Sequence, residues 1–147
     1  MAVGLGDQSP SATKVCVCVV MYALGLFLMI AADAQKTFTL RVKRGLIHDG
    51  LFARSRNPNY LGEVLIYSSF GVVVQHWLAW SILLVAWSSL FMPLMLAKER
   101  SLRKKPGWVD YTRRSWVFLP KLVPNSDLVT AALYTLLAAV LVRLSPA

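Results

Sequence analysis

Four apolar segments alternate with polar loops along this chain. They lie at residues 15–32, 60–74, 77–97 and 128–142, and the first and third contain eighteen and twenty-one residues without a charge. Segments of this length can cross the hydrocarbon core of a bilayer as helices. The last segment holds only fifteen apolar residues, and we expect it to span with its ends at the interface rather than to lie in the membrane plane. The pattern predicts an all-α integral membrane protein with about four transmembrane helices.

The two ends of the chain are expected to differ from the central part. Residues 1–14 contain Gly, Ser and Pro with a single lysine, which predicts a short disordered lead. The apolar run after them also resembles a signal peptide, although it is longer than a usual signal core. We therefore expect a main membrane domain at 15–121, in which 37–42 can extend the first helix, and an additional C-terminal helix within 122–147.

Charge is concentrated in the two long polar loops. The chain is 56% hydrophobic with a formal net charge of +9, and fourteen of its sixteen Lys and Arg residues lie in 33–63 and 98–121. Loops rich in Lys and Arg remain cytoplasmic, so both loops are expected there, with the N-terminus and the hairpin tip Gln75–His76 on the opposite side. Such loops also attract anionic membrane lipids or an anionic cofactor. Nothing in the pattern indicates nucleic-acid binding.

Cysteine and histidine positions do not indicate a metal site. Cys16 and Cys18 are two residues apart on a predicted helix and point about 200° apart, so they cannot pair with each other. His48 and His76 lie on opposite sides of a predicted membrane segment. No metal is expected, and no Gly-rich phosphate loop or Ser-His-Asp set is present.

The stretch from Arg54 to Glu63 carries the densest chemistry, directly before an apolar segment. Two arginines there can each bind an anion with two parallel hydrogen bonds. The amide, phenol and carboxylate groups that follow offer partners for ribose or base edges, with Glu63 also able to hold an arginine in place, and Gly62 leaves room for a ligand. The candidate binding residues are Arg54, Arg56, Asn59, Tyr60, Gly62 and Glu63. The alternative interpretation is an interfacial turn in which Asn57-Pro58-Asn59 starts a helix and the arginines meet lipid phosphates.

Further candidates lie beside the first helix and in the second loop. If both loops are cytoplasmic they can converge over the hairpin and form one cleft for an anion at the interface. The residues added to the site on this basis are Lys36, Glu99, Arg100, Tyr111 and Arg114. The run Arg103-Lys104-Lys105 is explained adequately as a solvated cationic face, so these three are excluded from the site.

The motifs resemble the C-terminal domain of the steroid 5α-reductase superfamily, over about residues 31–120. They are Ala-Asp-Ala-Gln-Lys at 32–36, Gly-Leu-Phe-x-x-Ser-Arg-Asn-Pro-Asn-Tyr-Leu-Gly-Glu at 50–63, Lys-Glu at 98–99, Pro-Gly at 106–107 and Tyr111. In reductases of this superfamily the motif helps bind NADPH, whereas in the related isoprenylcysteine carboxyl methyltransferases a similar stretch helps bind S-adenosylmethionine. Asn59 and Glu63 match the reductase form, and Arg100 stands where the methyltransferase pattern has a second acid. Asn57 replaces a histidine that is frequent in both.

The resemblance implies an NADPH-dependent reductase, or its cofactor-binding half, acting on a double bond of a lipid-like substrate such as a sterol or polyprenoid. The alternatives are an S-adenosylmethionine-dependent membrane methyltransferase and a non-catalytic accessory subunit. Reductases of the superfamily carry further helices before the segment at 15–32. The resemblance therefore leaves three interpretations open: a truncated product, a chain that takes these helices from a partner subunit or a second copy, or a chain that has lost catalysis. The catalytic residues stay unassigned, and the endoplasmic reticulum membrane is the expected location in a eukaryote.

Overall fold

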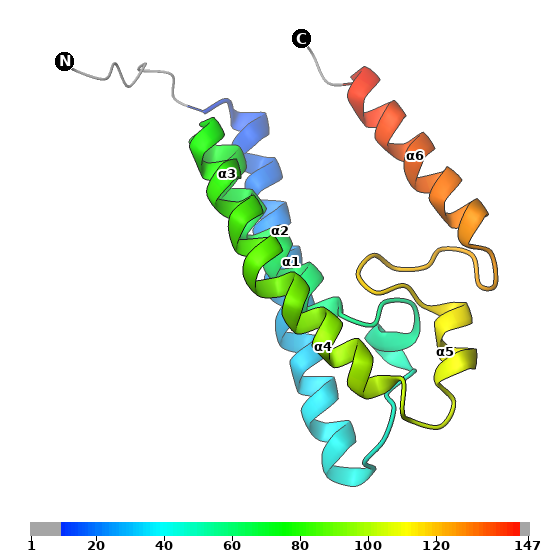
Figure 1. The fold of residues 1–147 in the computed structure, drawn as a ribbon. Coiled ribbons are helices and arrows are strands. Elements are labelled where there is room, and N and C mark those ends of the chain that lie inside the picture. Colours follow the sequence, from blue (N-terminus) through cyan, green and yellow to red (C-terminus); the bar gives the residue numbers. More distant parts are fainter. Residues whose placement is uncertain (1–9, 145–147) are drawn as a thin grey trace.

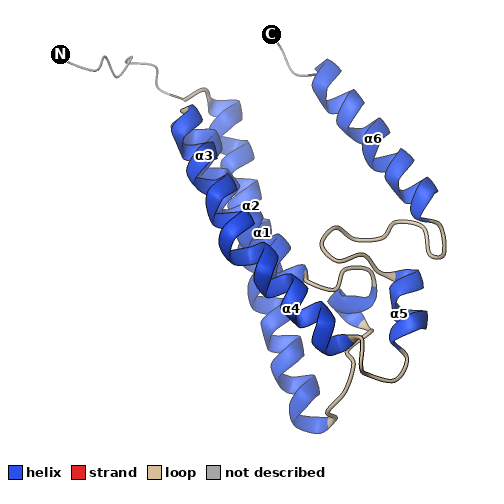
Figure 2. Cartoon of the chain, in the orientation of Figure 1, coloured by secondary structure: helices blue, strands red, loops and turns tan. Residues whose placement is uncertain are grey.

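The computed structural model describes residues 10–144, and its described part is helical without strands. A lone parallel bridge joins Ser55 to Trp116. The all-helical prediction is confirmed (Figure 2). In chain order the elements are α1 (Ala12–Val42), the 3-10 turn η1 (Gly50–Ala53), α2 (Pro58–Val74), α3 (Trp77–Ala86), the π-helical turn η2 (Trp87–Phe91), α4 (Met92–Leu102), α5 (Trp108–Arg114) and α6 (Asp127–Leu144).

Helix α1 is longer than the apolar segment that predicts it. It begins after Ser11, whose hydroxyl accepts a hydrogen bond from the Lys14 amide, and it continues to Val42. The prediction that residues 12–14 belong to a disordered lead is therefore wrong, while residues 1–9 lie outside the described part. The polar loop also starts later than residue 33, because neither Gly nor Pro interrupts the helix there. At 31 residues α1 is about 46 Å long, so it exceeds the bilayer core of about 30 Å.

Helices α1 and α2 form an antiparallel pair that touches backbone to backbone (Figure 1). A Cβ atom placed on Gly62 would lie 2.5 Å from the Gly25 carbonyl oxygen, and one on Gly25 would lie 2.6 Å from the Gly62 carbonyl oxygen. Small residues at such crossings let helices approach closely where no hydrophobic driving force acts between them. The pair of glycines therefore sets the separation of these two helices.

A proline explains the irregular turn in the third apolar segment. Pro93 has no backbone N–H and its ring clashes with the preceding turn, which removes one regular helical hydrogen bond. In the turn before it the Met92 N–H bonds to the Trp87 carbonyl, five residues back, so the helix opens into the π-helical turn η2. The helix continues through this turn, so α3, η2 and α4 form one continuous element from Trp77 to Leu102.

The ends of the helices separate the polar loops from the hairpin tip. The Lys14 amine donates to the side chain of Gln75, which places the start of α1 beside the α2–α3 turn. The end of α1 lies at the opposite end, whereas α2 starts about half way along α1, where Gly62 meets Gly25 (Figure 1). The end of α4 and α5 lie beyond the start of α2, on the same side as the end of α1. Helix α6 returns toward the first end and stands apart from the other long helices. This arrangement is compatible with the prediction that both basic loops lie on one side of the membrane.

Two helices are long and apolar enough to cross a membrane, namely Ala12–Val42 and the continuous element Trp77–Leu102. The 17 residues of α2 fall short of that length, as does the apolar part of α6, Asp127–Ala139. A membrane protein is therefore indicated by two helices. The four crossings and the sidedness of the loops stay predictions.

We predict that enlarging Gly62 will separate α1 from α2. Gly62→Leu should lower the free energy of unfolding by about 1–3 kcal/mol, because the added side chain must displace backbone atoms of α1. Thermal unfolding of the detergent-purified protein would measure this. Ala23→Leu on the exposed side of α1 is the matched control and should leave the melting temperature nearly unchanged. Equal effects of the two changes would contradict the crossing.

The topology can be tested with glycosylation acceptor tags in a eukaryotic cell. A tag inserted between Gln75 and Trp77 should be modified, because this tip is expected to face the lumen. A tag in the 98–121 loop should remain unmodified. Modification of the second tag would invert the predicted orientation.

Candidate functional site

The stretch predicted to be a binding motif also pairs with a distant segment of the chain. Residues 54–57 pair with residues 115–121, and we call these two segments the clasp. The Arg56 amide donates to the Trp116 carbonyl at 2.8 Å, and the Arg54 carbonyl accepts from the Trp116 and Lys121 amides at 3.1 and 2.8 Å. The Ser55 hydroxyl donates to the Phe118 carbonyl at 2.6 Å, and the Asn57 amide donates to the Val117 carbonyl at 2.7 Å. The first loop is thus fastened to the segment that follows α5.

A buried ion pair fastens the clasp to α4. The Arg56 Nε lies 2.9 and 3.1 Å from the two carboxylate oxygens of Glu99, and both residues are almost fully buried. The Arg56 Nη1 also donates to the backbone carbonyl and the hydroxyl of Ser115. The guanidinium lies over the Trp108 ring, 5.3 Å from its centre. Arg56 therefore joins α4, α5 and the clasp, and its charge is balanced by Glu99.

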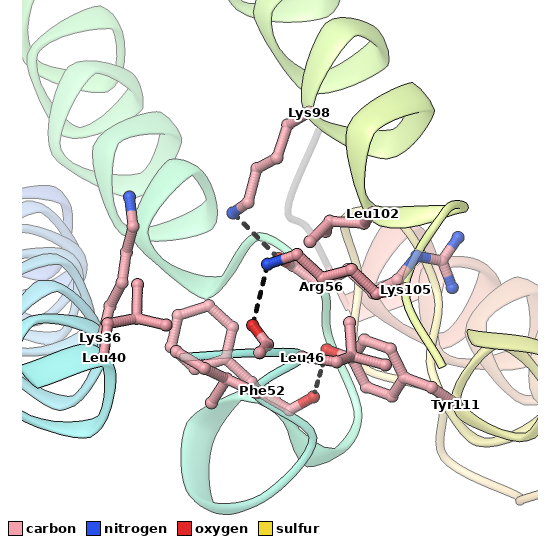
Figure 3. Close-up of a pocket in the computed structure, with 11 residues that line it drawn as sticks. Lys36, Leu40, Leu46, Phe52, Arg56, Lys98, Leu102, Lys105 and Tyr111 are labelled. Carbon is pink, nitrogen blue, oxygen red and sulfur yellow. Dashed lines mark hydrogen bonds between the residues drawn. The ribbon is translucent and has the colours of Figure 1, made fainter. Parts of the chain in front are cut away.

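A cavity of about 200 Å³ lies beside this ion pair, at the end of the helices where the polar loops meet. Its apolar wall is formed by Leu40, Leu46, Ile47, Phe52 and Leu102, and its remaining lining residues are Lys36, Gly45, Arg56, Lys98, Lys105 and Tyr111. Figure 3 shows the three lysines extending toward this space from α1, from α4 and from the turn after α4. No carboxylate appears among the lining residues.

Neutral groups hold two of these three lysines. The Lys98 amine donates to the Asn57 side-chain oxygen at 2.9 Å and to the Arg56 carbonyl at 3.3 Å, while the Lys105 amine donates to the Gly45 carbonyl at 2.8 Å. Because these acceptors carry no net charge, the positive charges at the cavity are not neutralised by them. A ligand with negative charge would be attracted there.

The hydroxyl group of Tyr111, a residue that lines the cavity, makes a buried hydrogen bond. It donates to the Phe52 carbonyl at 2.8 Å, and Tyr111 is only 2% exposed. Burial raises the pKa of this phenol, more than the nearby Arg56 lowers it, so the group stays protonated as a donor. Tyr111 thereby anchors η1 to α5, and its chemical role at the cavity is one of positioning.

The predicted site residues are only partly brought together. Lys36, Arg56 and Tyr111 line the cavity, with Glu99 directly behind them. Gly62 instead packs against α1, so the room it was expected to leave for a ligand is filled by backbone. The remaining candidates lie outside the lining: Asn59, Tyr60 and Glu63 on α2, and Arg54, Arg100 and Arg114 as exposed cations.

Two details of the expected roles change. Glu99, not Glu63, holds Arg56 in place. The sequence predicts Lys105 on a solvated face, yet it lines the cavity, because the turn after α4 carries it back toward Gly45. Lys98 was also missed, although its place directly before Glu99 at the end of an apolar segment is a usable signal. On α2, the Asn59 amide oxygen is buried without a hydrogen-bond partner among the described residues.

We predict that removing one partner of the buried ion pair destabilises the protein, whereas replacing both partners by apolar residues does not. Arg56→Met should lower the free energy of unfolding by about 3–5 kcal/mol, because it leaves the Glu99 carboxylate buried without its partner. The double variant Arg56→Met/Glu99→Leu should recover most of that loss. Chemical unfolding in detergent would measure both.

The exposed Arg100, one residue from Glu99, provides the control, and Arg100→Met should change stability by no more than about 0.5 kcal/mol. The single variant Glu99→Leu completes the comparison. If the stability losses of Arg56→Met and Glu99→Leu add up to the loss in the double variant, Arg56 and Glu99 do not depend on each other.

Comparisons with known proteins place the chain in a family without assigning an activity. Over 63 residues it is 35% identical to an uncharacterised protein of the fission yeast Schizosaccharomyces pombe, in an alignment that covers 39% of this chain and 23% of that protein. The chain thus spans about a quarter of the length of this curated relative. No solved structure matches. Residues 3–107 match the family described as "protein of unknown function (DUF1295)", which includes the first loop, Glu99 and all three cavity lysines. Because this match covers more than half of the chain, the protein belongs to the DUF1295 family.

Proposed function

We propose that the protein is a membrane-embedded NADPH-dependent reductase, or the cofactor-binding part of one, that acts on a double bond of a lipid-like substrate. Its motifs resemble those of the steroid 5α-reductase superfamily, in which the DUF1295 family is grouped. The two apolar spanning helices support a substrate that is reached from the bilayer. Fold-level resemblance alone does not determine chemistry, so the proposal depends on the cavity.

The observation that supports this proposal is that three lysines and no carboxylate line the cavity. NADPH is a polyanion, and its phosphates suit such a set of amines. S-adenosylmethionine carries a sulfonium, an ammonium and a single carboxylate, so its net charge is positive and it would be attracted less by Lys36, Lys98 and Lys105 than a polyanion. The electrostatics therefore favour the reductase over the methyltransferase.

In this proposal the cavity holds one phosphate-bearing part of the cofactor rather than the whole molecule. Its volume of about 200 Å³ is below the roughly 300–1,000 Å³ of pockets that enclose drug-sized ligands. Lys36, Lys98 and Lys105 would bind phosphate, and the Arg56–Glu99 pair would keep α4 and the clasp in register around it. When bound, NADPH supplies a hydride to the substrate. The group that protonates the substrate is assigned to no residue of this cavity, and a partner subunit or a second copy can provide it.

We predict that Lys36 contributes directly to cofactor affinity. It is the cavity lysine on an exposed helix surface, so its removal should leave the fold intact. Lys36→Gln should weaken NADPH binding about tenfold or more, because a hydrogen bond to a charged group contributes roughly 1.5–3 kcal/mol. Titration of the detergent-purified protein with NADPH, and in parallel with S-adenosylmethionine, would measure this.

Lys104 is the matched control, because it is exposed and does not line the cavity. Lys104→Gln should leave the affinity within about twofold of the parent. A parent that binds S-adenosylmethionine and not NADPH would support the methyltransferase instead. A parent that binds neither would support a non-catalytic accessory subunit.

A further inference from the structure

A polar hollow lies where helix α5 ends and helix α6 begins. Its volume is about 410 Å³, and it is lined by Arg113, Lys121, Asn125 and Asp127. Arg113 belongs to α5, Lys121 to the clasp and Asn125 to the turn before α6, and Asp127 is the first residue of α6. None of these residues lines the lysine cavity, so the hollow is a separate feature of the molecule.

Contacts with α5 and with the clasp fix the shape of this hollow. The Asn125 amide donates to the Arg113 carbonyl at 2.9 Å, which fastens the turn to the end of α5. The Lys121 amide donates to the Arg54 carbonyl at 2.8 Å, and Lys121 is only 2% exposed. Lys121 is therefore a fixed part of the clasp rather than a mobile surface lysine.

Asp127 uses one of its two carboxylate oxygens within the described part of the chain. The Lys121 amine and the Trp116 indole both donate to Oδ1, at 2.7 and 2.6 Å. Oδ2 accepts no hydrogen bond from the described residues, and the Asp127 side chain is 74% exposed. A carboxylate can accept several hydrogen bonds, and those from charged donors are the strongest. Oδ2 is thus available to a donor group outside the chain.

Arg113 offers the opposite charge. Its guanidinium lies 3.6 Å from the Asp110 carboxylate, and both side chains are mostly exposed. Exposed pairs of this kind contribute little free energy, so an anionic ligand can replace this contact. A guanidinium binds phosphate through two parallel N–H donors. The hollow therefore combines a donor set for phosphate with an acceptor for ammonium.

The charges of the lining favour a zwitterion over a simple ion. Arg113 and Lys121 against Asp127 give a net charge of +1, so a simple cation would be repelled. A simple anion would bind at Arg113 but would leave Asp127 Oδ2 without a donor. A ligand that carries a phosphate and an ammonium group satisfies both sides.

Exposed apolar residues lie directly beside these charged ones. Leu122, the residue after Lys121, is 46% exposed, and Leu128, the residue after Asp127, is 81% exposed. The apolar part of α6 continues to Ala139. Charged groups followed at once by exposed apolar side chains are typical of the boundary between lipid headgroups and acyl chains. A ligand that suits both parts has a zwitterionic head and a hydrocarbon body.

We propose that the hollow binds the headgroup of a zwitterionic phospholipid whose ammonium group carries N–H donors, which is the chemistry of phosphatidylethanolamine. Its phosphate contacts Arg113 and Asn125, its ammonium donates to Asp127 Oδ2, and its acyl chains lie along the exposed apolar surface of α6. Phosphatidylcholine lacks the N–H donors, and phosphatidylglycerol lacks the positive charge. This binding involves neither the lysine cavity nor a cofactor, so it does not depend on the proposed function.

The experiment compares headgroups on the full chain in detergent. Dioctanoyl phosphatidylethanolamine, phosphatidylcholine and phosphatidylglycerol are titrated at about 0.3 M salt, where attraction between exposed charges is screened. Phosphatidylethanolamine should bind about three- to tenfold more tightly than phosphatidylcholine, because only its ammonium can donate to Asp127. It should also bind more tightly than phosphatidylglycerol, which presents no ammonium. Any other order of affinities, equal affinities or absence of binding would overturn the proposal.

The phosphate contact is tested with Arg113→Gln, which changes an exposed side chain and should leave the fold intact. This variant should bind phosphatidylethanolamine and phosphatidylcholine about three- to tenfold more weakly. Arg114→Gln is the matched control, because Arg114 is the next residue on α5, is exposed and does not line the hollow. It should keep both affinities within about twofold of the parent. Equal effects of the two variants would contradict a site at Arg113.

The ammonium contact is tested with Asp127→Asn. The amide keeps an oxygen for Lys121 and Trp116 but removes the negative charge, so the preference for phosphatidylethanolamine over phosphatidylcholine should disappear. Asp110→Asn changes an exposed carboxylate outside the lining and should keep the preference. A preference retained in folded Asp127→Asn would overturn the proposal. Melting temperatures show whether each variant is folded, and if Asp127→Asn is not, the headgroup order of the parent and the Arg113 comparison decide the outcome.

Discussion

The buried pair of Arg56 and Glu99 is the interaction on which the polar end of this protein depends. It joins the first loop, which arrives from α1, to α4, which arrives from the other spanning element. The backbone pairing of 54–57 with 115–121 then brings the segment after α5 onto the same point. A charge pair this deeply buried contributes little net stability compared with apolar residues of the same shape, yet removing one partner is costly. Its value in this fold is therefore geometric, since it specifies which loop meets which helix.

This geometry separates two roles among the basic residues. Arg56 is paired with a carboxylate and organises the site, whereas Lys98 and Lys105 at the cavity are held by amide and carbonyl oxygens, which carry no countercharge. Exposed cations outside the lining, such as Arg100 and Lys104, match the charge bias of a cytoplasmic loop. Neighbouring basic residues of these loops thus differ in burial and in hydrogen-bond partners.

A second constraint acts within the bilayer part. The contact between Gly25 and Gly62 fixes the distance between α1 and α2, and the π turn before Pro93 gives the other spanning element an irregular surface toward α2.

Helix α6 is attached mainly at its start, where the Lys121 amine and the Trp116 indole both donate to Asp127 at 2.7 and 2.6 Å. These bonds lower the pKa of the Asp127 carboxyl, so it stays ionised at neutral pH.

The sequence by itself determined the helical class, the apolar segments and the start of α2 at Pro58, because length, hydropathy and proline chemistry act locally. It also identified Lys36, Arg56, Glu99 and Tyr111 as neighbours of one site through their chemical type and motif spacing. Only the tertiary structure decided their roles. The partner of Arg56 lies 43 residues away, Gly62 faces a helix rather than a ligand, and Lys105 turns back onto Gly45. Such outcomes depend on which segments meet in space. Contacts between residues far apart in the sequence form only when the intervening loops close, so a local sequence pattern does not predict them.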